Sequence, residues 1–164
     1  DLGDLKDIKL SLKQAILNKP ERFDRGWKSK DRYSMDWYYP ILCGVIYGED
    51  AEERFNYIEK EFIVEGLGCK CVKEEPWITV AESSELVMAL AACDQNIRAK
   101  EIFSWLHQWK DPRDNLYWTG YVYSDKAFWP IEKPTWTAAA VLLAADTLFK
   151  FTEASELFLK DWSK

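Results

Sequence analysis

The sequence predicts an all-α fold of tandem helical hairpins, with about seven helices arranged in an inner and an outer layer. Apolar residues recur at spacings of three and four through most of the chain, which is the period of an amphipathic helix. Only seven glycines and six prolines occur in 164 residues, too few for a loop-rich all-β fold. This length is typical of a single domain, here residues 1–164.

Each helix can be placed from its apolar pattern and its ends. The first has recurring apolar residues from Leu5 to Ile16 and ends before Pro20. Further helices are expected at about 36–47, 51–64, 80–93, 96–110, 134–148 and 152–162. Pro40 is expected in the first turn of the second helix, where proline is tolerated. The stretches between these helices are expected to be loops.

The predicted helices repeat three times as an apolar helix, an amphipathic helix and a long loop. Phe62, Trp109 and Trp162 fall at equivalent positions of the three copies, at offsets of 47 and 53 residues. A period in this range indicates an array of helical hairpins. A helix that is apolar on every side must be buried, whereas an amphipathic helix faces water. The apolar helices are therefore expected to form the inner layer and the amphipathic helices the outer layer.

Two arrangements fit this pattern, an open α-solenoid and an α/α toroid. The long loops all enter the inner helices at their N-terminal ends, so they gather at the end where a toroid has its cleft. Solenoids have short and uniform connections, whereas long loops are usually functional. The sequence therefore favours a partial α/α toroid.

The charge and the cysteine content argue against several classes of protein. The net charge is −6 and no basic run stands out, which argues against nucleic-acid binding. No stretch approaches the roughly 20 apolar residues that span a bilayer, and four cysteines are too few for a disulfide scaffold. We therefore expect a cytoplasmic protein. Zinc could be held by Cys69, Cys71 and His107, but C-x-C is not the usual spacing, so we expect no metal and no cofactor.

An aromatic cluster is the most informative short run of the sequence. Seven rings lie within 20 residues, namely Tyr117, Trp118, Tyr121, Tyr123, Phe128, Trp129 and Trp136. Their irregular spacing, broken by Gly120 and Pro130, predicts a surface loop that leads into the helix near Pro134. Such rings either pack together as a plug or are presented to a ligand.

Two stretches resemble known families. Residues 103–118, with the sequence FSWLHQWKDPRDNLYW, resemble the helix-plus-turn repeat of the prenyltransferase and squalene-cyclase toroids. Residues 117–140 are similar to six-hairpin glycosidases, in which an aromatic loop and a Thr-Trp-Thr-Ala-type helix start line the sugar cleft. A complete toroid has twice as many hairpins as this chain supplies. The chain would then be a fragment of a longer protein, one half of a homodimer, or an open arc.

The resemblance to prenyltransferases and cyclases implies residues that this sequence lacks. Terpenoid cyclases of that fold use an Asp-x-Asp-Asp motif, and chain-elongating prenyltransferases use Asp-Asp-x-x-Asp; neither run is present, and Asp111 with Asp114 does not replace the second. Protein prenyltransferases bind zinc through Asp, Cys and His, but His107 lies on a helix expected in the outer layer. Glycosidase chemistry needs only two carboxyl groups that face each other across a cleft.

The carboxylates expected near such a cleft lie at the starts of the inner helices. Asp36 opens one helix, and Glu82 and Glu85 point along the same face of another, because they are three residues apart. A carboxylate at the buried start of an apolar helix has a raised pKa, as a general acid requires. We therefore predict Glu85, Glu82 and Asp36 as catalytic candidates. Asp36 and Glu82 could equally cap a helix or oppose its N-terminal dipole.

The residues predicted to bind substrate lie at the same end. They are Trp37, Trp77, Trp118, Tyr121, Tyr123, Trp129, Glu132, Trp136 and Arg32. Indole rings can stack on sugar rings, and tyrosine hydroxyls can bind sugar hydroxyls. Arg32 could bind an acidic group of the ligand or pair with a neighbouring aspartate. Any single ring could instead fill the axis of the toroid.

The sequence leaves three functions open. The first is a carbohydrate-directed, hydrolase-like domain that binds an oligosaccharide or another small molecule. The second is a prenyltransferase-like or terpenoid-cyclase-like domain that handles an isoprenoid. The third is a non-catalytic helical-repeat module that binds a ligand or a protein. The mixed polar and aromatic cleft favours sugar, because an isoprenoid tunnel needs no carboxylate cluster.

Overall fold

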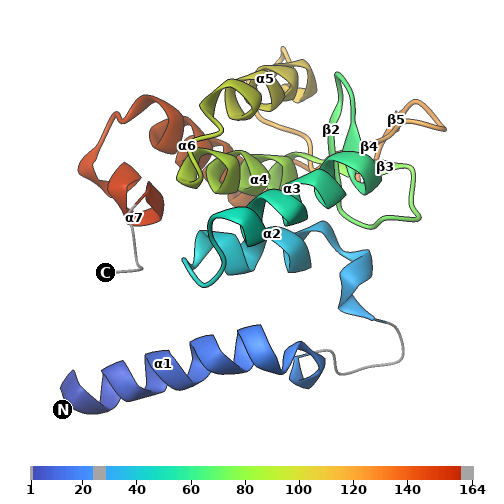
Figure 1. The fold of residues 1–164 in the computed structure, drawn as a ribbon. Helices are drawn as coiled ribbons and strands as arrows, with labels where there is room; N and C mark the ends of the chain where they lie inside the picture. The colour runs from blue at the N-terminus through green and yellow to red at the C-terminus, as the bar shows by residue number, and fades with distance from the viewer. Residues whose placement is uncertain (1, 24–28, 160–164) are drawn as a thin grey trace.

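The computed structural model describes residues 2–23 and 29–159 and has an α+β fold (Figure 1). The α-helices of this part are α1 Leu2–Asn18, α2 Ser34–Leu42, α3 Glu49–Glu61, α4 Val80–Ala92, α5 Asn96–Leu106, α6 Thr135–Phe149 and α7 Glu156–Leu159. The strands are β1 Ile63–Val64, β2 Gly68–Lys70, β3 Trp77–Thr79, β4 Gly120–Val122 and β5 Ala127–Phe128. Short 3-10 turns occur at Pro20–Arg22, Lys30–Arg32, His107–Trp109 and Glu153–Ser155.

The prediction of an all-α fold, and with it of a partial α/α toroid, was wrong, because strands occur in two of the expected loops and at the end of the helix expected at about 51–64. The connection between α3 and α4 contributes β1, β2 and β3, and the connection between α5 and α6 contributes β4 and β5. These strands form one antiparallel sheet in the order β1-β2-β3-β4-β5. Ile78 pairs with Tyr121, and Tyr121 pairs with Phe128. Strands of two or three residues are too short to show an alternating pattern in the sequence.

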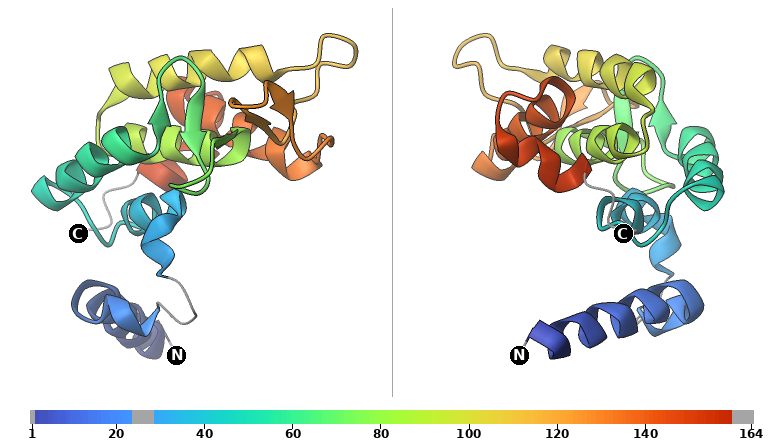
Figure 2. Two further views of the ribbon diagram at one scale, coloured as in Figure 1. Left: turned by 90° about the vertical axis from the view of Figure 1, so that its right-hand side faces the viewer. Right: turned by 60° about the vertical axis from the view of Figure 1, so that its left-hand side comes forward.

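Helix α4 is the central helix of the molecule (Figure 2). It packs against α2, α5 and α6 and also contacts β2. Val87 and Ala89 of α4 are fully buried, and the same core contains Tyr38 of α2, Ile58 of α3 and Ile102 of α5. The prediction of a buried apolar helix at this position is therefore confirmed.

Helices α2, α4 and α6 all begin next to the sheet. The amide of Ser34 donates to the carbonyl of Cys71, just after β2 (3.1 Å), and the amide of Val80 donates to the carbonyl of Thr119, just before β4 (3.0 Å). The amide of Thr119 donates in turn to the carbonyl of Glu132, shortly before α6 (3.2 Å). The long connections therefore do gather at the starts of these helices, but as a sheet rather than as loops.

Helix α6 was expected to be buried on every side, and this expectation was wrong. Thr137 and Ala144 are buried, whereas Trp136 is 52% exposed and Leu142 is 70% exposed. Alanine allows close approach to α4 on one face, and none of the described elements buries the opposite face. An apolar composition alone cannot show which faces of a helix find a partner.

Several helix ends differ from the prediction. Helix α2 begins at Ser34, so Pro40 lies inside the helix rather than in its first turn. The carbonyl of Pro40 accepts hydrogen bonds from the amides of Val45 and Ile46 (2.9 and 3.0 Å), where the chain turns towards α3. Trp162, the third member of the predicted repeat, lies outside the described residues.

Helix α1 forms where the sequence predicted it, but its apolar side chains do not join the core. Leu5, Ile8 and Leu12 are all more than half exposed, and Figures 1 and 2 show α1 lying apart from the other helices. Its Lys13 Nζ lies 5.2 Å from the centroid of the Tyr47 ring. In residues 2–23 and 29–159, no helix has the length and apolar character needed to cross a membrane.

Candidate active site

The carboxylate of Glu85 is bound by two consecutive tyrosines. The hydroxyl of Tyr38 donates to Glu85 Oε2 at 2.9 Å, and the hydroxyl of Tyr39 donates to the same oxygen at 3.1 Å. The two rings meet nearly edge to face, with centroids 5.2 Å apart and planes at 83°. Because α2 packs on α4, neighbouring positions of α2 bring both phenols to one point on α4.

The surroundings of Glu85 favour its protonated form. Burial raises the pKa of the Glu85 carboxyl above its ordinary value. The two phenol hydrogen bonds act in the opposite direction, because they stabilise the carboxylate, and the charge of Glu82 raises the pKa further. Burial first, and then the charge of Glu85, raises the pKa of both Tyr38 and Tyr39. Both phenols are therefore neutral donors.

Glu82 lies one turn before Glu85 and near two thiols. Its Oε2 is buried and has no hydrogen-bond partner among the described residues, although the Cys71 thiol lies close enough for the Glu82 carboxylate to raise its pKa. Burial, and then the charge of Glu82, raises the pKa of the Cys71 thiol to about 12, and burial raises the pKa of Cys69 as well. Both cysteines are therefore neutral thiols at neutral pH.

Buried oxygens without a partner among the described residues share one location in the fold. The four atoms are Ser34 Oγ, Thr79 Oγ1, Glu82 Oε2 and Thr137 Oγ1. They lie at the starts of α2, α4 and α6, where these helices meet the sheet. These four buried oxygens therefore make this end of the core polar.

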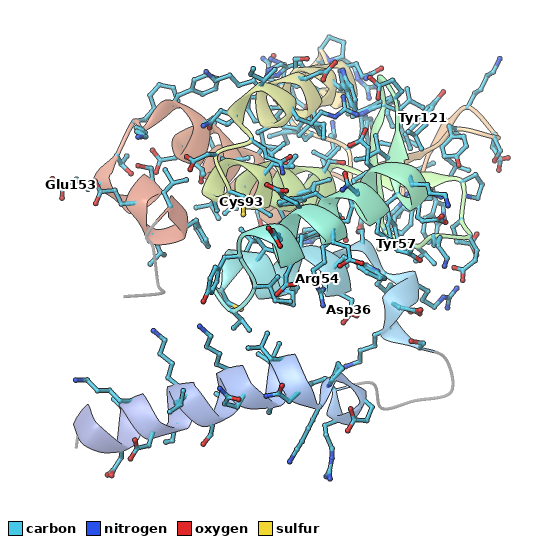
Figure 3. All side chains as sticks on the ribbon, in the orientation of Figure 1. Asp36, Arg54, Tyr57, Cys93, Tyr121 and Glu153 are labelled. Atoms are coloured by element: carbon cyan, nitrogen blue, oxygen red, sulfur yellow. The ribbon has the colours of Figure 1, made fainter. Side chains whose placement is uncertain are left out.

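The structure does not join Asp36 to the two glutamates through any described contact. Asp36 is exposed in the first turn of α2, beside Arg54 of α3 (Figure 3). Arg54 Nη1 donates to the main-chain carbonyls of Asp36 and Trp37 at 3.2 and 3.1 Å. Burial lowers the pKa of Arg54, and the charge of Asp36 opposes that shift.

Two of the predicted binding residues are engaged in packing. The Trp37 indole N–H donates to the carbonyl of Asp31 (2.8 Å), and its ring stacks on Tyr57 with centroids 3.9 Å apart. Trp118 stacks on Phe128 at 4.9 Å. Both rings therefore have structural contacts that account for them without a ligand.

The sheet holds a second group of these rings. Tyr121 stacks on Trp109 with centroids 4.6 Å apart, and Tyr123 is half-buried against the core. The Trp77 indole N–H donates to the carbonyl of Trp129 (2.8 Å), and the two rings lie edge to face. Trp129 itself is 57% exposed, so it presents an aromatic surface to solvent.

The remaining predicted binding residues lie at the edges of the same region. Trp136 is exposed in the first turn of α6. The Glu132 side chain is exposed, and its main-chain carbonyl accepts a hydrogen bond from the amide of Thr119, just before β4. Arg32 forms an ion pair with Glu74 at 3.3 Å. Their described contacts do not link them to Glu82 or Glu85.

The sequence analysis missed Tyr38 and Tyr39 as site residues. Two adjacent phenols in an apolar helix need hydrogen-bond partners once buried, and that need was the available signal. His107, considered for zinc, instead lies with Nδ1 3.1 Å from the Tyr117 hydroxyl oxygen. Within the described part of the chain, no group of three or more His, Cys, Asp or Glu side chains could hold a metal ion.

Comparison with known proteins identifies one informative similarity. No protein-family model matches the chain. A curated protein from Mycolicibacterium hassiacum, MMP endo-(1,4)-3-O-methyl-alpha-D-mannosidase, is 47% identical over 147 residues. The match covers 90% of this chain and 40% of the relative, so the chain spans less than half the relative's length. The earlier resemblance to the α/α-toroid superfamily was wrong, because the fold contains a sheet and this relative is named as an endo-mannosidase.

Proposed function

We propose that this chain is part of a glycoside hydrolase that cleaves internal α-(1,4) linkages in a 3-O-methylmannose polysaccharide. The observation that carries the proposal is the 47% identity, over 90% of the chain, to the M. hassiacum endo-mannosidase. The isoprenoid alternative has no comparable support, because neither that relative's name nor a described contact points to a lipid.

Glu85 is the proposed general acid. Glycoside hydrolysis needs one carboxylic acid to protonate the leaving oxygen and a second carboxylate to activate water or to attack the sugar. The pKa of Glu85 is raised by burial, which keeps a carboxyl protonated nearer to neutral pH. Glu82, one turn away on α4, and Asp36, at the start of α2, are the candidates for the second carboxylate.

The exposed indoles are the proposed sugar platform. Trp129 and Trp136 present more than half of their surface, and the Trp77 indole N–H holds the main chain of Trp129. Flat indole surfaces suit the C–H faces of sugar rings. Trp37, Trp118, Tyr121, Tyr123, Glu132 and Arg32 stay predictions.

The test is hydrolysis by the full-length protein. An α-(1,4)-linked oligosaccharide of 3-O-methylmannose is the substrate, and mass spectrometry follows the appearance of shorter oligosaccharides. Glu85→Gln should lower kcat by about 10²–10⁴-fold, the usual contribution of a general acid. Glu53→Gln, on the exposed surface of α3, is the matched control and should retain wild-type activity.

Two results would oppose the proposal in different ways. Binding of the oligosaccharide without cleavage by the wild-type protein would indicate a non-catalytic binding module. Wild-type activity in Glu85→Gln would leave hydrolysis intact but would remove Glu85 as the acid.

A further inference from the structure

Both phenols donate to the same oxygen of Glu85, and the other oxygen receives neither. Tyr38 is fully buried, Tyr39 is 45% exposed, and Glu85 itself is partly buried. The contacts at 2.9 and 3.1 Å both end on Oε2. The carboxyl group is therefore asymmetric, with its two oxygens in different hydrogen-bonding environments.

This asymmetry determines where the proton of a neutral Glu85 resides. Each phenol has one O–H and uses it to donate to Oε2, and two such bonds occupy the lone pairs of that oxygen. Protonation of Oε2 would displace one of them, and displacement of Tyr38 would leave a fully buried donor without its acceptor, which is unfavourable. Protonation of Oε1 keeps both bonds.

We propose that Tyr38 and Tyr39 are positioning residues that keep the transferable proton of Glu85 on Oε1. The placement of the proton follows from the geometry alone. Its delivery to a sugar rests on the proposed function.

The other groups that influence Glu85 do not compete for this role. On α2 they are the two phenols, and on α4 the neighbour is Glu82, which adds negative charge. Beyond β2, Cys71 is a neutral thiol whose pKa the charge of Glu85 also raises. None of these groups is a cation that would draw the carboxylate into an ion pair.

In the proposed transfer, Glu85 gives its proton to the leaving oxygen of the sugar. The O–H bond at Oε1 breaks, and the proton passes to the glycosidic oxygen while the bond from that oxygen to the anomeric carbon breaks. A water molecule supplies the new bond to the anomeric carbon and gives its proton to the second carboxylate. The electron pair stays on Glu85, where the two phenol bonds strengthen as the charge develops.

Infrared spectroscopy of the full chain locates the proton without any substrate. The spectrum is recorded just above pH 4.3, about the ordinary pKa of glutamic acid, and the C=O band that Glu85→Gln removes is assigned to Glu85. With the proton on Oε1, Oε2 is the carbonyl oxygen and accepts both phenols. Tyr39→Phe should then move the band to higher frequency, and Tyr38→Phe should do the same.

The matched control is Tyr47→Phe, which removes a hydroxyl from an exposed ring in the link between α2 and α3 and should leave the band unmoved. An unchanged or lowered frequency in Tyr39→Phe would overturn the inference, because it would place the proton on Oε2. Tyr39→Phe should also raise the pKa of Glu85, since it removes one hydrogen bond to the charged form.

Activity separates this inference from the proposed function. If the wild-type protein hydrolyses the oligosaccharide, the alkaline limb of its pH–rate profile should move upward in Tyr39→Phe by the shift seen in the titration. A band shift without any hydrolysis would support the placement of the proton and reject the proposed function. Hydrolysis without a band shift would reject the placement and leave the function standing.

Discussion

Burial of Glu85 destabilises the folded protein when the carboxyl group is charged. The same burial favours the proposed role of Glu85 as a general acid. A carboxyl whose pKa is raised in the folded state binds a proton more tightly there than in the unfolded chain. The contribution of Glu85 to stability is therefore fully present below the unfolded pKa of about 4.3 and is lost as the pH rises through the raised folded value. The two phenol hydrogen bonds reduce this loss, because they stabilise the carboxylate.

Glu85→Gln should remove the part of the pH dependence of folding stability that comes from Glu85. Glutamine is neutral, and its side-chain oxygen can accept the same two phenol bonds. We expect Glu85→Gln to have a higher Tm than the wild-type protein at pH 7 and an equal Tm near pH 4, about the unfolded pKa. Thermal unfolding followed by circular dichroism at both pH values measures the difference. A lower Tm for the variant at pH 7 would show that the charged carboxylate is net stabilising.

At the scale of elements, the sheet depends on a close approach at the start of β4. Gly120 pairs with Thr79 of β3, and a Cβ added at Gly120 would lie 2.5 Å from both the carbonyl oxygen of Ile78 and Trp77 Nε1. That indole N–H holds the carbonyl of Trp129. The absence of a side chain at Gly120 therefore lets β4 pair with β3. It also leaves room for the contact between Trp77 and Trp129, two of the predicted binding residues.

Gly120→Ala should destabilise the fold by about 1–3 kcal/mol, the usual cost of overpacking. Gly66→Ala is the control, because Gly66 has a φ of +75° but no atom near the position of an added Cβ. Its cost should be close to the roughly 1 kcal/mol expected from backbone strain alone. Urea unfolding of both variants provides the comparison. Equal costs would mean that the sheet accommodates the methyl group by a small shift.

At the scale of the whole molecule, α6 carries one packed face and one exposed face. Leu148 is 8% exposed and belongs to the core, whereas Leu142 on the same helix is 70% exposed. The apolar side chains of α1 are exposed as well. Large exposed apolar patches mark sites of interaction with another chain, so the exposed leucines of α6 raise the question of whether a partner covers them.

Two matched substitutions on α6 measure whether its outer face is covered in solution. Leu148→Ala should cost about 2–5 kcal/mol, as for a buried leucine, whereas Leu142→Ala should change stability by less than about 0.5 kcal/mol. Chemical denaturation of the chain at several protein concentrations tests both values. A large and concentration-dependent cost for Leu142→Ala would mean that a second copy covers this face.

The sequence predicted the helices well and the connections poorly. Periodicity placed α4 and α5 because each runs for several turns, over which an apolar pattern can repeat. It could not show β3 or β4, since Trp77 and Tyr121 take extended structure through hydrogen bonds to partners about forty residues away. The all-α prediction failed for that reason.

The candidate site, too, was predicted from the sequence only in part. The spacing of Glu82 and Glu85 by itself determined that both carboxylates share a face at the start of an apolar helix, because the helical period sets side-chain direction. Only the tertiary structure decided that Tyr38 and Tyr39 bind one oxygen of Glu85, that Trp37 is used in packing, and that one face of α6 is left exposed. Local periodicity depends on neighbours along the chain, whereas hydrogen-bond partners and burial depend on which distant segments come together.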